Sequence, residues 1–164
     1  MRVAITGTPG TGKTSATELL DTDLGVLHLN DIIEREGLYT ERDTERDSLV
    51  VDLESLREYV GDREGIIESH LAHHLPVGRV VVLRCEPDEL ERRLLERGES
   101  EAKAEENAES EALDLILSEA VTEHGLEKMY EIDTTERAPE EVAREIERVI
   151  SGEREPSAGE VTFS

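Results

Sequence analysis

The stretch GTPGTGKTS at residues 7–15 decides the fold of this chain. It follows an apolar run at residues 2–6 (RVAIT) and leads into a run with helical character at residues 13–20 (KTSATELL). Its first eight residues fit the pattern G-x-x-x-x-G-K-[ST]. The glycines let successive backbone N–H groups turn inward around an anion, and the positive end of the helix dipole adds to the attraction. A strand, a loop and a helix of this kind predict a phosphate-binding site.

Each residue type in this loop has its own task in binding a polyphosphate. Gly10 and Gly12 allow the backbone to wrap around phosphate oxygens. Lys13 can reach the β- and γ-phosphates, and the Thr14 hydroxyl can hold Mg²⁺. Ser15 can donate to an inner phosphate. The expected ligand is a nucleoside triphosphate, ATP, bound with Mg²⁺. The alternative is a glycine-rich turn between a strand and a helix that binds nothing.

Short apolar runs alternate with helical patterns along the rest of the chain. Strands are predicted at residues 2–6, 25–30, 65–69, 79–84 and 129–133, and helices at 13–20, 31–37, 53–61, 86–98, 100–125 and 139–150. This alternation predicts an α/β fold, a five-stranded parallel sheet with helices on both faces. Residues 1–152 are expected to form a single domain. The tail at residues 153–164 lacks periodicity and is expected to be disordered.

The charge of the chain is strongly negative. Its 164 residues include 41 Asp and Glu against 18 Lys and Arg, a formal net charge of -23. In dilute buffer such a chain repels itself, whereas above about 1 M salt the Debye length is about 3 Å or less and the repulsion is screened. The composition therefore indicates a salt-rich cytoplasm, as in a halophile. With no basic patch in the sequence, direct nucleic-acid binding is not expected, and a basic protein partner is easier to accommodate.

Two further features favour a cytoplasmic location. The sequence has no apolar run of about 18 residues, and its start lacks the long apolar segment of a secretory signal, so no membrane association is expected. Its single cysteine, Cys85, cannot form an internal disulfide, which is typical of a reducing compartment.

A carboxylate and a histidine lie at the end of the predicted strand at residues 65–69 (GIIES). Glu68 is in position to order Mg²⁺-bound water, and His70 to orient a nucleophile, since the carboxyl ends of parallel strands meet at one edge. The alternative is an exposed acid in a turn and a surface histidine. His70, His73 and His74 together also suggest zinc, but no cysteine or carboxylate stands at ligand spacing, so a metal cluster is disfavoured.

Three arginines end the predicted helix at residues 86–98. Phosphoryl transfer needs arginine on the charge that develops at the transferred group, and a mobile lid can carry such a residue. Arg97 is the candidate because it stands beside Gly98 at a hinge-like break. Arg92 is expected to pair with neighbouring glutamates instead. Arg93 shares a helix face with Arg97.

These motifs together resemble the adenylate kinase isoenzyme 6 family of archaea and eukaryotes. The matching pieces are GTPGTGKTS, Asn30-Asp31, Gly37-Leu38-Tyr39, the triplet Glu68-Ser69-His70, VVLR followed by LERRLLERG, and the N-x-x-x-E pattern of Asn107 and Glu111. The resemblance covers roughly residues 1–150. The phosphate-binding loop alone is common to many nucleotide-binding proteins, whereas its combination with the E-x-H triplet and the Arg-Gly lid is much more specific.

The resemblance implies a P-loop kinase fold with strand order 2-3-1-4-5. It implies phosphoryl transfer from ATP to AMP and other nucleoside monophosphates, with an additional ATPase activity. It also implies a role in maturing the small ribosomal subunit and its RNA, through transient binding of ribosomal protein S11. The monophosphate-binding insertion would lie near residues 28–51 and the lid near residues 96–106.

Residue roles follow from the same resemblance. The ATP-binding residues would be Gly10, Gly12, Lys13, Thr14, Ser15 and Arg97, and the catalytic ones Lys13, Arg97, Glu68 and His70. Thr14 would hold Mg²⁺ directly and Glu68 through water. Asp31 and Arg35 would contact the monophosphate.

The chain also departs from the family pattern, and alternatives stay open. Glu68 stands where many members have aspartate, and Glu34 where many adenylate kinases have an arginine for the monophosphate. The sequence therefore does not identify AMP as the preferred acceptor. A second hypothesis is an ATPase switch that acts on ribosomal protein S11. A third is a kinase for a small metabolite on the same scaffold.

Overall fold

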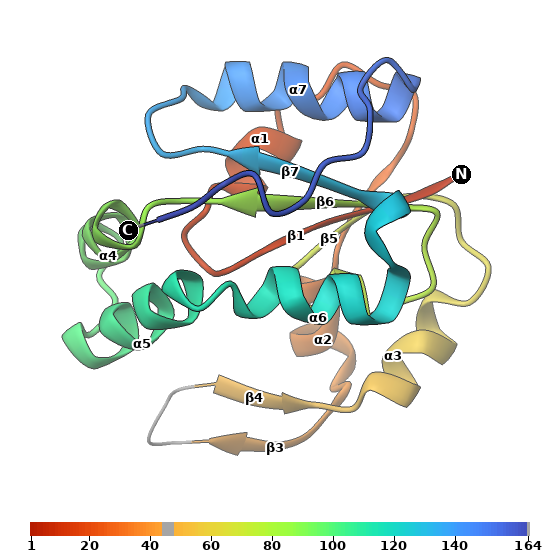
Figure 1. Cartoon of the computed structure of the whole chain (residues 1–164). Coiled ribbons are helices and arrows are strands. Elements are labelled where there is room, and N and C mark those ends of the chain that lie inside the picture. Colours follow the sequence, from red (N-terminus) through yellow and green to blue (C-terminus); the bar gives the residue numbers. More distant parts are fainter. Residues whose placement is uncertain (44–47, 164) are drawn as a thin grey trace.

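A computed structural model describes residues 1–43 and 48–163 and shows a parallel sheet between layers of helices (Figure 1). Within these residues, five parallel strands lie in the order β2-β5-β1-β6-β7. Their bounds are β1 Arg2–Gly7, β2 Val26–His28, β5 Gly65–Glu68, β6 Arg79–Arg84 and β7 Met129–Asp133. Numbered as the parallel strands follow one another along the chain, this is the order 2-3-1-4-5, and the predicted fold class is confirmed.

Helices cover both faces of the sheet (Figure 1). Their bounds are α1 Lys13–Thr17, α2 Leu29–Glu36, α3 Leu53–Val60, α4 Pro87–Glu96, α5 Glu101–Ala112, α6 Leu115–His124 and α7 Pro139–Ser151, with short 3-10 turns η1 Ala72–His74 and η2 Leu126–Lys128. Successive side chains of a strand point to opposite faces. Val3 and Ile5 therefore pack toward α1 and α7, whereas Ala4 packs toward α2, α3 and α6. Each face of the sheet thus has its own hydrophobic core.

The strand register brings the carboxyl ends of the central strands to one edge of the sheet. Ile5 of β1 pairs with Glu68 of β5, and Gly7 pairs with Leu83 of β6. Arg84 pairs with Asp133 of β7. The helices α4 and α5 pack together at this end of the molecule (Figure 1). The loops that follow β1, β5, β6 and β7 therefore converge on a single site.

The structure has an antiparallel hairpin between α2 and α3 that was not among the predicted elements. Its strands are β3 Tyr39–Asp43 and β4 Ser48–Val51. The sequence reads there as a charged connection, TERDTERDS at residues 40–48, of which residues 44–47 lie outside the described part. Tyr39, Leu49 and Val51 pack against the core on the α3 side. These tertiary contacts stabilise strands that the charged sequence does not predict.

The predicted long helix at residues 100–125 is two helices, α5 and α6. The break lies at Asp114, which has a positive φ of 54°, unusual for a residue with a side chain. The Asp114 carboxylate accepts a hydrogen bond from the buried guanidinium of Arg84. This contact between residues distant in the sequence holds the strained backbone, and helical periodicity alone does not reveal it.

The tail differs from the disorder that the sequence favours. Ser157 pairs with Tyr130 in a parallel bridge beside β7. The Ser157 N–H donates to the Met129 carbonyl at 2.8 Å, and the Glu131 N–H donates to the Ser157 carbonyl at 3.0 Å. The backbone N–H groups of Glu160 and Val161 donate to the Glu131 carboxylate at 3.1 and 3.2 Å. Residues 153–163 therefore cover the β7 edge; Ser164 lies outside the described residues.

Truncation after Gly152 is expected to lower the free energy of unfolding by about 1–3 kcal/mol. The shortened chain loses the hydrogen bonds from the tail to Met129 and Glu131. Urea denaturation in multimolar KCl measures the change, with the slope of the transition as a check on two-state unfolding. An unchanged midpoint would show that the tail does not stabilise this edge.

Candidate active site at the phosphate-binding loop

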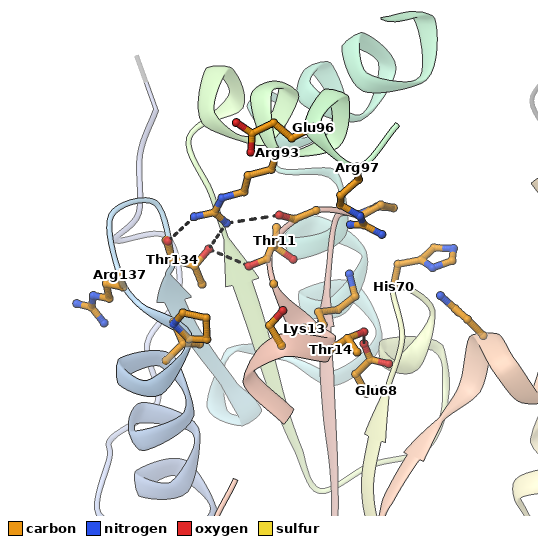
Figure 2. Close-up of a pocket in the computed structure, with 17 residues that line it drawn as sticks. Thr11, Lys13, Thr14, Glu68, His70, Arg93, Glu96, Arg97, Thr134 and Arg137 are labelled. Atoms are coloured by element: carbon orange, nitrogen blue, oxygen red, sulfur yellow. Dashed lines mark hydrogen bonds between the residues drawn. The ribbon is translucent and has the colours of Figure 1, made fainter. Parts of the chain in front are cut away.

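The loop after β1 forms one wall of a pocket of about 700 Å³ at the carboxyl edge of the sheet (Figure 2). The pocket is lined by Pro9, Gly10, Thr11, Gly12, Lys13, Thr14, Ser15, Asn30, Glu68, His70, Arg93, Glu96, Arg97, Thr134, Arg137, Pro139 and Val142. The loops after β1, β5 and β7 and the end of α4 all contribute to it. Every residue predicted for the ATP site and for catalysis lines this one pocket.

Two glycines of the loop adopt backbone conformations that favour glycine. Gly10 has φ +95° and Gly12 has φ +98°. A Cβ on Gly10 would lie 2.8 Å from a Leu90 methyl carbon and 3.0 Å from Leu94. Gly12 has open space on that side and directly precedes α1. The loop therefore needs glycine at Gly10 for packing and conformation, and at Gly12 for conformation.

The Lys13 ammonium lies inside the loop. Its Nζ donates to the carbonyls of Gly7 at 2.9 Å and Thr8 at 3.2 Å. Burial lowers the pKa of Lys13 from 10.5 to about 8; the Glu68 carboxylate opposes this shift and the Arg97 charge adds to it. A bound anion would supply negative charge next to this desolvated cation. Electrostatics and geometry therefore favour the same ligand, a phosphate group.

A hydroxyl and a carboxylate meet beside Lys13. Thr14 Oγ1 donates to Glu68 Oε1 at 3.0 Å, and Glu68 Oε2 lies 3.2 Å from His28 Nδ1. Glu68 is only 4% exposed. Hydroxyl and carboxylate oxygens are the donors that Mg²⁺ prefers, so the pair fits that ion. The Glu68 carboxylate reaches both Thr14 and His28.

His28 is a contact that the sequence reasoning missed. It ends β2 and pairs with Glu68 across the sheet. The predicted strand ran on to residue 30, so the sequence did not place His28 at a strand end, whereas β2 ends at His28 in the structure. The order of β2 beside β5 was needed to bring the two side chains together.

His70 is half-buried and lines the pocket (Figure 2). Burial, together with the smaller effect of the nearby Lys13 charge, lowers its pKa from 6.5 to about 4. The imidazole is therefore neutral at pH 7 and has one nitrogen that can accept a proton or a hydrogen bond.

Arg92 and Arg93 of α4, and Arg97 directly after it, have separate surroundings. Arg92 is exposed and pairs with Glu89 and Glu96, as expected. Arg93 donates to the Thr134 carbonyl at 2.8 Å and to the Gly10 carbonyl at 3.4 Å, so it links two loops (Figure 2). In the described part of the chain, the Arg97 side chain forms no ion pair or hydrogen bond, and it lines the pocket. Of these three arginines, Arg97 is the one available to a ligand.

Buried hydrogen bonds join the phosphate-binding loop to α5 and to the end of β7. The Thr8 hydroxyl donates to Glu111 at 3.0 Å, and Glu111 in turn accepts from Arg84 at 3.1 Å. The Thr134 hydroxyl donates to the Thr11 carbonyl at 2.9 Å. Arg84 also pairs with Glu131 at 2.7 Å. Arg84 ends one predicted strand and Thr134 directly follows another. Sequence reasoning did not select either as a site residue.

The predicted monophosphate contacts do not line this pocket. Asp31 and Arg35 are exposed on α2, and the Arg35 side chain lies 3.2 Å from the Glu36 carboxylate. Glu34 pairs with Arg42 of the hairpin at 2.8 Å. From the same segment Asn30 lines the pocket instead. The role of Asp31 and Arg35 stays a prediction.

Across residues 1–43 and 48–163, no helix has both the length and the apolar character that a bilayer crossing demands.

Comparison with known proteins identifies relatives over the whole chain. Residues 3–114 match the family described as “AAA domain”. A protein of Natronomonas pharaonis with the name “Putative adenylate kinase” is 61% identical, and the match covers 100% of this chain and 98% of that protein. A protein of the same name from Halobacterium salinarum is 56% identical over the same shares. A third, from Methanosarcina acetivorans, is 46% identical over 92% of this chain and 86% of its own.

The first two of these relatives come from halophilic archaea, in agreement with the acidic composition of the chain. Among solved structures, a shikimate kinase from Bacteroides thetaiotaomicron has a TM-score of 0.56 at 20% identity, over 93% of this chain and 98% of that one. That likeness concerns the fold alone.

Proposed function

Because this chain belongs to the AAA domain family and to the family of archaeal adenylate kinases, we propose that it is a Mg-ATP-dependent nucleoside monophosphate kinase. It converts ATP and AMP into two ADP in the cytoplasm and accepts other nucleoside monophosphates. The observation that carries this proposal is the position of Lys13, inside the glycine loop and next to the Thr14–Glu68 pair. A strand, an anion-binding loop and an oxygen-donor pair in one pocket match the needs of phosphoryl transfer.

The residues of the pocket divide the work. Lys13 and the loop N–H groups bind the β- and γ-phosphates, and Arg97 neutralises charge on the group in transfer. Thr14 and Glu68 would hold Mg²⁺, which supplies charge neutralisation between the phosphates. Arg93 and Thr134 keep the loop in shape through the contacts at Gly10 and Thr11. No general base is required, because the acceptor is itself a phosphate.

The test measures ADP formed from Mg-ATP in multimolar KCl, with and without AMP, CMP or dAMP. ADP that rises only with a monophosphate, two molecules per event with AMP, is the expected result. ADP that rises equally without any acceptor would contradict the kinase and favour an ATPase. Bound ATP without turnover in either case would favour a small-metabolite kinase.

A second candidate activity is ATP hydrolysis as a switch in small-subunit ribosome assembly. The observation that favours it is His70, neutral at pH 7 and on the wall of the pocket that Lys13 enters. A neutral imidazole can orient water toward the γ-phosphate. The partner proposed from the family resemblance is ribosomal protein S11, and the acidic surface suits a basic partner. Added S11 is expected to raise ATP turnover. An unchanged turnover would contradict the role as a switch.

A further inference from the structure

A second cluster of charged and metal-ligating side chains lies between η1 and α6, outside the residues that line the nucleotide pocket. His73 and His74 come from η1, and Glu119 and Glu123 stand one turn apart on α6. His73 Nε2 lies 2.9 Å from Glu119 Oε1. His74 Nδ1 lies 2.8 Å from Glu123 Oε2, and its Nε2 lies 3.6 Å from Glu119 Oε1. The two imidazole rings are 4.1 Å apart between centroids.

The contacts of His74 point to a cation at this place. A neutral imidazole carries one N–H, yet both nitrogens of His74 face carboxylate oxygens. One nitrogen lone pair is therefore directed toward a negative charge. A second proton or a metal ion removes that repulsion. With two carboxylates in contact with two imidazoles, the local charge suits a divalent ion.

The donor atoms also match a known type of metal site. One ligand atom from each of His73, His74 and Glu123 lies within 4.8 Å of the other two. Two imidazoles and a carboxylate form the His₂Glu set of zinc sites that keep a position open. His73 is completely buried, and its Nδ1 lies 2.7 Å from the Thr6 hydroxyl. Such a second hydrogen bond fixes the ring and directs the other nitrogen toward a metal.

We propose that His73, His74 and Glu123, with Glu119 beside them, bind one divalent transition-metal ion, Zn²⁺ in preference to Mg²⁺. Imidazole nitrogens favour Zn²⁺ over Mg²⁺, so this site and the Thr14–Glu68 pair select different ions. The ion would join η1 to α6. It would also lie one hydrogen bond away from Thr6, the residue before the phosphate-binding loop. The bound ion would support the strand that carries the loop.

The test uses the full chain, stripped with a chelator and exchanged into multimolar KCl with excess Mg²⁺ and no nucleotide. The Mg²⁺ occupies oxygen-only sites and the acidic surface. Zn²⁺ is added, and bound metal is measured per chain after gel filtration. Co²⁺ is used in parallel, because its visible absorption reports nitrogen and oxygen ligands. The variants are His74→Gln and Glu123→Gln, with Glu127→Gln as a control that removes the same charge from an exposed position outside the cluster.

One Zn²⁺ per chain is the expected result for the wild type and for Glu127→Gln. We expect His74→Gln and Glu123→Gln to bind Zn²⁺ at least about 10-fold more weakly, in line with the effect of lost ligands and their supports. Zn²⁺ should raise the melting temperature of the wild type but not of these two variants. Melting in the absence of Zn²⁺ confirms that each variant is folded. The proposal would be overturned if the wild type bound no Zn²⁺, or if all four proteins bound Zn²⁺ equally well.

Discussion

Lys13→Met is expected to reduce the rate of ADP formation from Mg-ATP and AMP by about 10³-fold, on the scale of a lost charge-stabilising group in phosphoryl transfer. Lys13 Nζ lies within the glycine loop, 2.9 Å from the Gly7 carbonyl. In the proposed mechanism, the ammonium neutralises charge on the transferred phosphate. Steady-state kinetics in multimolar KCl measure the loss. It should appear in kcat as well as in kcat/KM, because the charge matters most in the transition state.

The folded state of this variant should survive the change. Burial lowers the pKa of Lys13 to about 8, which means that the protein holds the charged form at a cost in stability. Replacing the ammonium by an apolar side chain should therefore leave the melting temperature of the nucleotide-free protein equal or higher. Lys128→Met is the matched control, since Lys128 is exposed on η2, and full activity is expected. Near-normal turnover by Lys13→Met would refute the assigned role of the loop.

Arg97→Ala is expected to lower kcat/KM by about 10²–10³-fold. Arg97 lines the pocket next to Lys13 and forms no ion pair or hydrogen bond with the described residues. Its charge contributes to lowering the Lys13 pKa, which places the two cations around one volume. Two cations in that arrangement repel each other without an anion and both stabilise a phosphate placed between them. The same assay with Mg-ATP and AMP measures the effect.

Arg92→Ala provides the comparison for this prediction. Arg92 is exposed, lies outside the pocket lining and pairs with Glu89 and Glu96. Exposed pairs of this kind contribute about 0–1 kcal/mol to stability, so its loss should leave kcat/KM close to that of the wild type. Equal losses in Arg92→Ala and Arg97→Ala would indicate a general effect of charge on α4. Arg97→Lys separates charge from the geometry of the guanidinium fork, and partial activity is expected.

Much of the fold and of the pocket could be predicted because the signals are local. The pattern around Gly12 and Lys13 is a continuous stretch, and its chemistry follows from backbone freedom and one side chain. The strand order was predicted from the family resemblance, and Glu68 and Arg97 followed from their places at the ends of predicted elements. All of these residues line one pocket in the structure.

The rest depended on contacts between distant parts of the chain. Arg84 and Asp114 explain why one predicted helix is two, and Glu131 explains why the tail lies along β7. Sequence periodicity reports which face of an element is apolar. It does not report which buried charge will meet which partner, since that depends on the order of the strands.

The histidines at residues 70–74 illustrate the same division. From the sequence alone, a metal cluster is disfavoured because no cysteine or carboxylate stands at ligand spacing. The structure directs His70 into the nucleotide pocket and brings Glu119, 46 residues from His73, to within 2.9 Å of it. The phosphate-binding loop could be recognised from the sequence because that site is built from neighbouring backbone groups. The partners of His73, His28 and Arg84 became known from the fold, because the packing of the helices on the sheet sets distances that sequence spacing does not contain.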